Sequence, residues 1–554
     1  MNKLTILLIC FFGVVSWLNP YHFGRWTSAE SDFFIFLSLI LCFFYTIINY
    51  KKIFLKKQNF LFLFIISVPI LQYFFGLIYF FGDAFIAIIY IIAFFIVLSL
   101  GNTLGENRID RQQAFLFFSY LVIFSSLISV YIQLEQWLKL GSFVVFMAEI
   151  PPNGRPFANF GQPNTLATFL LCGLFSVLYL YERQKIGVFV CILSSSILLF
   201  GVVLTQSRTP WVFAIIFLIW WFWKSKSAYL RIKTQGILIG YGIFILLLWV
   251  TPLISDFLTL NFRSVSERAY GGLQRIDLWQ QMLIALKNQP WIGYGWQQVS
   301  VAQIETTLLY PFYGWTEHSH NIILDILIWN GIPLGIIIII LIIWWLSRFI
   351  ALVNSPENFL FLSLIGTILV HAMFEYPLEY AFFLLPIGFL FGLIQVSETS
   401  HNSIILVPKS ISIVALLLSI TTYGVVFREY RIIGRGIQQA TYEALNIGTI
   451  YAKDKAPDIL ILTQLQAYIA LIRTQPRPHM TNEEIISVKK IAYRYSTKAA
   501  LIRYTQVLAL NGHKVEAVKH LNIIEKMYKD KINYNALLQV QDSLAFKWNQ
   551  SQND

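Results

Sequence analysis

Two histidines, His318 and His320, stand close together near the end of a long polar segment. The chain has only eight histidines, and these two directly precede the apolar run 322–329. Their spacing does not place both on one helix face and no cysteine is nearby, so no metal site is predicted. An imidazole titrates near neutral pH and suits general-base chemistry. We therefore expect one of the two to accept a proton, although a histidine in a helix-capping segment would look the same.

Two arginines have the chemistry of a phosphate clamp. Arg208 lies in "TQSRTP" between two apolar runs, and Arg275 begins a segment whose apolar spacing predicts an amphipathic helix. A guanidinium group is always charged and binds phosphate through two parallel hydrogen bonds. For Arg208 the alternative is a side chain that only reaches lipid head groups.

The segment 154–164, "GRPFANFGQPN", gathers polar side chains in an irregular stretch. Arg155, Gln162 and Asn164 stand there among two prolines and two glycines. Irregular backbone at membrane depth is tolerated where it is buried in protein or lines a watery cavity. We expect these side chains to line a binding site, and a solvated loop is the alternative.

A further polar stretch, "HAMFEYPLEY" from His371, carries Glu375, Tyr376 and Glu379. Carboxylates between spanning helices are costly unless they face water or a cation. One of the three arginines named above is the expected partner, and simple solvation of a loop is again the alternative.

These residues must be positioned by membrane helices, because the 554-residue chain is 57% hydrophobic, 17% aromatic and only 13% charged. Soluble domains carry about 25% charged residues, and disordered chains are poor in aromatics, so both classes are excluded. A spanning helix needs about 20 apolar residues. The fold class predicted is therefore all-α and polytopic, with about thirteen spans at 3–19, 32–50, 60–80, 84–101, 115–133, 165–181, 186–204, 210–223, 235–252, 321–346, 359–374, 380–397 and 404–427.

The net charge of +12 is explained mainly by orientation. Fourteen lysines and arginines fall in short loops of one side, which the positive-inside rule assigns to the cytoplasm. No nucleic-acid partner is therefore predicted. With an odd number of spans, the long loops 134–164 and 253–320 and the C-terminal segment lie on the external side.

Two domains are predicted: a transmembrane catalytic domain over 1–427, with those two external loops, and a soluble helical domain over 428–554. In the second, 504–528 has the pattern of a helical hairpin with Asn511 and Gly512 at its turn. The hairpin resembles one tetratricopeptide-type unit, which needs neighbours to bury its apolar faces. A plain helical cap is the alternative.

Four motifs, in chain order, resemble the bacterial O-antigen ligase/polymerase superfamily: "RPFANFGQPNTLATFL", "TQSRT", "GGLQRIDLWQ…PWIGYGW" and "HSHNIILDILIWNGIPLG". The first is characteristic of its PglL-type protein O-oligosaccharyltransferases. The resemblance runs from about Arg155 to Gly335. It implies a glycosyltransferase of the bacterial inner membrane whose active site and C-terminal domain face the periplasm. The implied reaction is en bloc transfer of an oligosaccharide from undecaprenyl diphosphate to Ser or Thr of a pilin or another periplasmic protein.

The resemblance also implies roles for single residues. His320 corresponds to the catalytic histidine, with His318 as the fallback. No metal and no other cofactor is implied. The expected diphosphate- and substrate-binding residues are Arg208, Arg275, Gln162, Arg155, Asn164 and Tyr376.

The expected chemistry follows from the leaving group. Charge grows on a diphosphate as the anomeric C–O bond breaks, so arginines stabilise the transition state more than the ground state. In-line attack by a hydroxyl that His320 deprotonates would invert the anomeric carbon. Two alternatives stay open: an O-antigen ligase that glycosylates lipid A-core and, from another class, a transporter. Acceptor choice is expected to lie in the C-terminal domain.

Overall fold

A bundle of apolar helices makes up most of the computed structural model, which describes residues 3–22, 24–141, 144–151, 154–260, 265–398, 404–445, 447 and 457–538. All thirteen predicted apolar runs contain a helix. Within the described ranges, eight helical segments are long and apolar enough to cross a membrane: α2 (Ala29–Asn49), η1 with α3 (Lys57–Phe60 and Leu61–Phe74), α4 (Phe81–Glu106), α5 (Arg108–Leu138), α6 (Pro163–Glu182), α9 (Thr234–Phe257), α12 (Ile322–Ala351) and α15 (Lys409–Leu445). The others are shorter: α1 (Lys3–Leu18), α7 (Val188–Leu204), α8 (Thr209–Lys224), α13 (Pro356–His371) and α14 (Ala381–Gln395). Several parts of the predicted external regions lie outside the described residues: 142–143, 152–153, 261–264, 446, 448–456 and 539–554.

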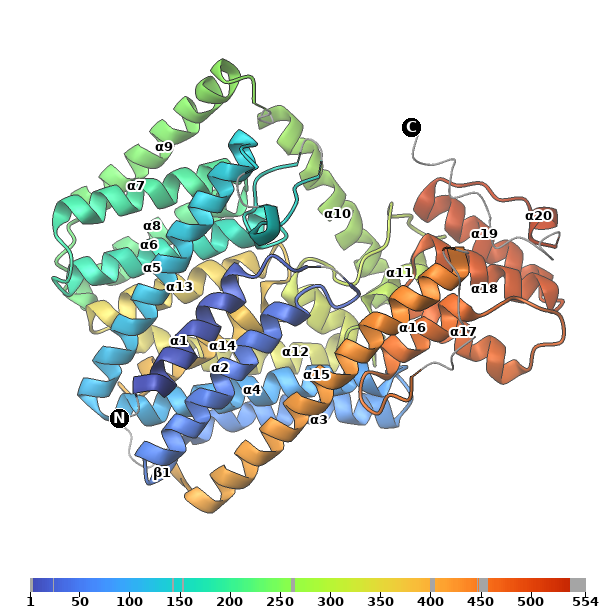
Figure 1. Cartoon of the computed structure of the whole chain (residues 1–554), viewed down its shortest axis with the longest axis horizontal. Helices are drawn as coiled ribbons and strands as arrows, with labels where there is room; N and C mark the ends of the chain where they lie inside the picture. The colour runs from blue at the N-terminus through green and yellow to red at the C-terminus, as the bar shows by residue number, and fades with distance from the viewer. Residues whose placement is uncertain are drawn as a thin grey trace.

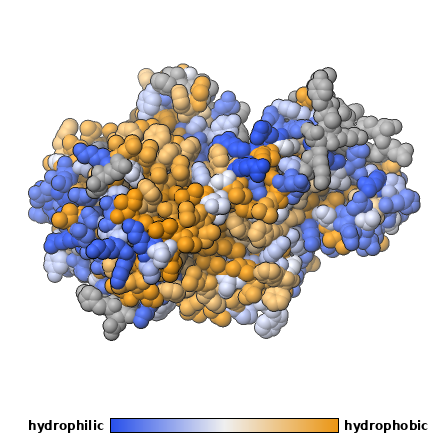
Figure 2. All heavy atoms as spheres, turned by 60° about the horizontal axis from the view of Figure 1, so that its bottom comes forward, coloured by the Kyte–Doolittle hydropathy of each residue, from blue (hydrophilic) through white to orange (hydrophobic). Residues whose placement is uncertain are grey.

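The spanning helices present a broad hydrophobic surface between two hydrophilic ends. Figure 2 shows this surface over the middle of the molecule, with hydrophilic residues at one end and on the C-terminal helices at the other. In Figure 1 the strand β1 (Lys52–Lys56) and the C-terminal helices lie at opposite ends of the bundle. The chain is a multi-pass membrane protein, and this arrangement agrees with basic loops and C-terminal helices on opposite sides.

One short ribbon interrupts the otherwise all-α fold. Strand β1 pairs antiparallel with β2 (Ile404–Pro408), so that Lys52 lies opposite Pro408. The prediction that the last span begins at 404 is wrong, because α15 begins only at Lys409. A short apolar run with β-branched residues has no periodicity that separates a strand from a helix.

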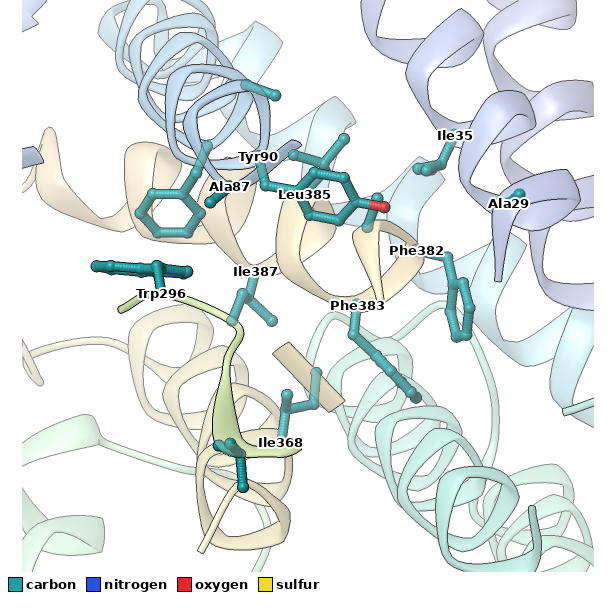
Figure 3. Packing of buried hydrophobic residues seen from close by; sticks show 14 of the residues in the cluster. Ala29, Ile35, Ala87, Tyr90, Trp296, Ile368, Phe382, Phe383, Leu385 and Ile387 are labelled. Atoms are coloured by element: carbon teal, nitrogen blue, oxygen red, sulfur yellow. The ribbon is translucent and has the colours of Figure 1, made fainter. Parts of the chain in front are cut away.

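Helices α4 and α14 form the closest pair in the core. A Cβ atom at Gly392 would lie 2.2 Å from the carbonyl oxygen of Leu98, and one at Gly101 would lie 2.4 Å from that of Phe389. Small residues of this kind let membrane helices approach closely. Figure 3 shows part of the neighbouring core, with Tyr90 of α4 and Leu385 of α14 among its buried side chains. The segment that holds Glu375 and Tyr376 leads into α14 through a short turn (Pro377–Glu379), so this close pair helps to position it.

Helix α15 continues from the membrane bundle into the predicted C-terminal domain. It runs past the predicted boundary at 427 to Leu445 and packs on α2, where Phe33 meets the rings of Phe427 and Tyr430 at 5.1 and 5.4 Å. Near its end, Glu429 accepts hydrogen bonds from the backbone N–H groups of residues 460–462. That carboxylate therefore fixes the chain where the C-terminal domain begins.

The C-terminal domain is a series of short helices: α16 (Thr463–Arg473), α17 (Asn482–Arg494), α18 (Lys498–Leu510), α19 (Lys514–Tyr528) and α20 (Tyr534–Leu538). The predicted hairpin is confirmed as α18 and α19, with Gly512 at φ +83° in the turn. Its buried side chains include Leu501, Val507 and Ile524. Helices α16 and α17 supply the neighbours that such a hairpin needs.

The long loop between α9 and α12, predicted to be external, contains α10 (Val265–Asn288) and α11 (Val299–Thr306) and packs against a break in α12. Gly331 has φ +73° and interrupts that helix. The carbonyl groups of Ile328 and Trp329 accept hydrogen bonds from the N–H groups of Tyr294 and Gly295, at 2.8 and 3.0 Å. Irregular backbone is thus satisfied by protein, as a membrane environment requires, and the loop is anchored beside the two histidines.

Candidate active site

His320 occupies a strained position at the start of α12. Its φ of +58° lies in the left-handed region, which costs a non-glycine residue about 1–3 kcal/mol unless its surroundings impose it. Ser319 supplies the constraint, because its N–H donates to Asp325 at 2.7 Å and its carbonyl accepts from Trp279 at 2.9 Å. Asn321 caps α12 by accepting from the N–H of Leu324 at 3.1 Å. Strain held in this way is typical of functional residues.

Glu375 connects most of the predicted site residues. One carboxylate oxygen lies 2.5 Å from Nδ1 of His320. The other accepts from Asn164 at 2.9 Å and pairs with Arg275. The sequence predicted an arginine partner for an acidic residue of this stretch, and Arg275 is the one that the structure brings to it.

The charge of Glu375 is strongly favoured. Burial alone would raise its pKa, but the hydrogen bond and charge of His320 and the charge of Arg275 outweigh burial and lower the pKa to about 2. The carboxylate is therefore an acceptor only, and Nδ1 of His320 must carry the proton of their hydrogen bond. In a neutral imidazole this leaves Nε2 with the free lone pair, as in a carboxylate–histidine pair of a hydrolase triad.

His318 has a different environment. Its half-buried ring stacks on Tyr376 with centroids 4.4 Å apart. Burial, followed by the charges of His320 and Arg494, lowers the pKa of His318 to about 3. His318 is therefore neutral at ordinary pH, and within the described residues no hydrogen-bond partner meets its Nδ1.

Tyr376 and the 154–164 motif complete the cluster. Gln162 donates to the Tyr376 hydroxyl at 2.9 Å, and the Tyr376 ring also meets that of His320 at 5.2 Å. Burial and the charge of Glu375 raise the pKa of Tyr376 to about 12, so the phenol stays protonated. Helix α6 begins at Pro163, which places Gln162 and Asn164 on either side of the helix start.

The segment 154–164, which carries Arg155, meets the segment before Arg208 beside this cluster. Arg155 donates to the carbonyl of Gln206 at 3.2 Å, and Ser207 donates to Asn164 at 2.7 Å. The Arg208 side chain is exposed at the start of α8. Partial burial and the nearby charge of Arg275 lower the pKa of Arg208. Across the described residues no carboxylate forms an ion pair with Arg208, so two cations lie close together with one of them uncompensated.

One local prediction needs correction. Arg275 does not begin its helix but lies inside α10, which starts at Val265. The recognised spacing starts at Ile276, whereas residues 265–275 mix polar side chains, glycines and apolar side chains. An apolar period therefore indicates where a helix has a buried face, and it does not mark where the helix begins.

Two features of the site were not predicted. Asp325 and Ser207 lie in motifs that were recognised, but neither was predicted as a site residue; they hold Asn164 and the loop with His318 and His320 (the histidine loop, residues 313–321) in place. Among the described residues no arginine forms an ion pair with Glu379, and Gln297 donates to it at 3.4 Å. Burial and the nearby charge of Asp325 raise the pKa of Glu379 to about 8. Within the described ranges, no three His, Cys, Asp or Glu side chains gather as metal ligands.

A stability prediction follows from Glu375. Its pKa in the folded protein is about 2 against an ordinary 4.5, so the stabilisation is complete above pH 4.5 and is lost as the pH falls towards 2. We expect the unfolding temperature in detergent to fall across this window, and to fall less for Glu375→Gln. If the unfolding temperature changed with pH by the same amount in both proteins, Glu375 would not be the source of the pH-dependent stability.

Comparison with known proteins decides the family. A general O-oligosaccharyltransferase of Acinetobacter baylyi is 31% identical over 98% of this chain and 96% of its own length. The chain belongs to the PglL-type protein O-oligosaccharyltransferases. A ComP-specific O-oligosaccharyltransferase of the same organism is 29% identical over 92% of each chain.

The site of this O-oligosaccharyltransferase draws on three matched family segments. Residues 156–181 match "Protein glycosylation ligase", 189–340 match "O-Antigen ligase", and 359–541 match "Virulence factor membrane-bound polymerase, C-terminal". Gln162 and Asn164 come from the first segment, both histidines and arginines 208 and 275 from the second, and Glu375 and Tyr376 from the third. The predicted family is confirmed.

Proposed function

We propose that this O-oligosaccharyltransferase transfers an oligosaccharide en bloc from undecaprenyl diphosphate to a Ser or Thr hydroxyl of a periplasmic protein, such as a pilin. The observation that carries the proposal is the contact of 2.5 Å between His320 and the buried carboxylate of Glu375, beside two arginines. A base and a cationic site stand together there, as glycosyl transfer from a diphosphate requires.

In the proposed reaction, Nε2 of His320 takes the proton of the acceptor hydroxyl while its oxygen attacks C1 of the first sugar. The C1–O bond to the diphosphate breaks, and undecaprenyl diphosphate leaves. The imidazolium that forms is stabilised by Glu375, whose low pKa keeps it from taking up the proton. Attack from the side opposite the leaving group inverts the anomeric carbon.

Arg208 and Arg275 would stabilise the charge that develops on the leaving diphosphate. Arg275 is partly neutralised by Glu375, whereas Arg208 is exposed and faces another cation. An anion placed between the two relieves their repulsion, which favours binding of a diphosphate there. Gln162, Asn164 and Tyr376 would orient the sugar and the base, and Arg155 would hold the 206–208 segment.

We expect transfer to be independent of divalent cations, because the arginines supply the charge and the external loops lack a D-x-D pair. Purified enzyme assayed with lipid-linked oligosaccharide and acceptor should keep its rate after EDTA treatment. A loss that Mg²⁺ or Mn²⁺ restores would contradict this expectation.

The proposal is tested by the two products of one purified reaction. The lipid product should be undecaprenyl diphosphate, and NMR of the glycopeptide should show the anomeric configuration opposite to that of the donor. Retention of configuration would refute the single-displacement mechanism.

The proposed orientation, with the site and C-terminal domain in the periplasm of a bacterial inner membrane, predicts that an external protease reaches the C-terminal domain in spheroplasts.

A further inference from the structure

The C-terminal domain holds the segment that leads to the two histidines. Ser300 of α11 donates to the carbonyl of Arg494 at 2.9 Å, and the N–H of Gly314 donates to the carbonyl of Met527 at 2.8 Å. The ammonium group of Lys529 lies 5.1 Å from the ring of Tyr313. The end of α17 and the end of α19 therefore both contact the segment that leads to His318.

Arg494 makes the central contact. Its side chain, at the end of α17, is only 6% exposed. Nε and Nη2 donate to the two carboxylate oxygens of Asp83 in α4, at 3.1 and 3.0 Å, while Nη1 donates to Glu317 at 3.4 Å. The planar guanidinium thus joins three parts of the chain: a spanning helix, the C-terminal domain and the histidine loop. A fork of several fixed donors suits this geometry, and a lysine would not reproduce it.

Glu317 directly precedes His318 and lies three positions before His320. The loop here must keep His320 at φ +58° and its Nδ1 against Glu375. Ser319 fixes the loop from the side of Asp325, at 2.7 Å. Arg494 fixes the loop through Glu317, so two residues that shortly precede the strained His320 are both held in place.

We propose that Arg494 is a positioning residue for the reaction, and that the C-terminal domain is part of the catalytic unit rather than only a site of acceptor choice. This inference rests on the proposed role of His320. Arg494 acts through Glu317 on the histidine loop and does not touch the substrate. Deletion of the domain would therefore abolish transfer to every acceptor, instead of changing which acceptor is used.

The sharpest variant is Glu317→Gln in the full-length enzyme. It removes the charge that links the loop to Arg494 and leaves the Arg494–Asp83 pair intact. Arg494→Ala is unsuitable, because it would leave the buried carboxylate of Asp83 without a partner and destabilise the fold. Arg494→Lys keeps a cation at Asp83 but loses the arm towards Glu317. Arg477→Gln is the matched control, since it removes an exposed ion pair with Glu484 in the same domain.

We expect Glu317→Gln to lower kcat by about tenfold to a hundredfold, the range for displacement of a catalytic group by about 1 Å. The number of donor-binding sites per chain and the affinity for lipid-linked donor should not change, which excludes simple misfolding. Arg494→Lys should give a similar loss, and the double variant should lose no more than either single variant. Arg477→Gln should match the wild type. Wild-type kcat in Glu317→Gln, or losses that multiply in the double variant, would overturn the proposal.

Hydrogen exchange separates this proposal from the proposed function. The amides of residues 313–321 should exchange faster in Glu317→Gln than in the wild type, whether or not the enzyme transfers glycan. Unchanged exchange would refute the proposal that the Arg494–Glu317 contact holds the loop in place. A wild-type enzyme that transfers no glycan, but whose loop loosens in the variant, would refute only the proposed reaction.

Discussion

Replacing His320 by Ala should reduce glycan transfer by about 10²–10⁴-fold, the usual contribution of a general base. The loss should appear in kcat, because the imidazole acts on the proton that moves in the transition state and holds no part of the donor. His320 is the histidine that contacts a carboxylate, at 2.5 Å, whereas His318 stacks on Tyr376. The measurement is the initial rate of transfer from lipid-linked oligosaccharide to an acceptor protein.

The matched control is His318→Phe, which keeps a ring to stack on Tyr376 and removes both nitrogens. We expect it to retain most of the activity, with an unfolding temperature close to that of the wild type. The assignment of the base would be reversed if His318→Phe were inactive and His320→Ala active. Full activity in both variants would remove histidine from the mechanism altogether.

Replacing Arg208 should produce the second largest loss. Removal of one donor from a site of developing charge costs about 10²–10³-fold in kcat, so Arg208→Gln should fall in this range. Arg208→Lys keeps the charge without the fork and should lie between Arg208→Gln and the wild type. Because the charge on the diphosphate grows as the bond breaks, kcat should fall by a larger factor than KM for the donor rises.

Arg231→Lys provides the control for this series. Arg231 is also exposed, but it lies in the loop after α8 at the end opposite Arg208, where its guanidinium lies 4.6 Å from the ring of Tyr181. The same change there should leave transfer unaffected. An unchanged rate in Arg208→Gln would show that the diphosphate is held elsewhere.

The sequence predicted the residues of the site better than their contacts. Apolar periodicity located the spanning helices, and short motifs identified Gln162, Arg208 and His320, because these signals are local. The ion pair of Glu375 with Arg275 joins residues 100 positions apart. Three arginines were equally plausible partners for that carboxylate until the helices were placed.

The role of Arg494 could not be predicted from its surroundings in the sequence. It stands at the end of an ordinary polar helix, and its partner Asp83 is 411 positions away in a spanning helix. The break at Gly331 is similar, since the carbonyl groups of Ile328 and Trp329 accept hydrogen bonds from two loop residues, Tyr294 and Gly295, which lie far from the break in sequence. Tertiary packing alone creates these contacts, and no propensity or period encodes them.

The central claim is transfer of a whole oligosaccharide to protein, and the intact mass of an acceptor protein tests it most directly. Cells that make a lipid-linked glycan would express this enzyme together with a candidate periplasmic acceptor, with His320→Ala in a parallel culture. We predict that the acceptor gains the mass of one complete oligosaccharide on a Ser or Thr with the wild-type enzyme, and no mass with the variant. An unmodified acceptor in both cultures, with the glycan found on lipid A-core instead, would contradict the account and identify an O-antigen ligase.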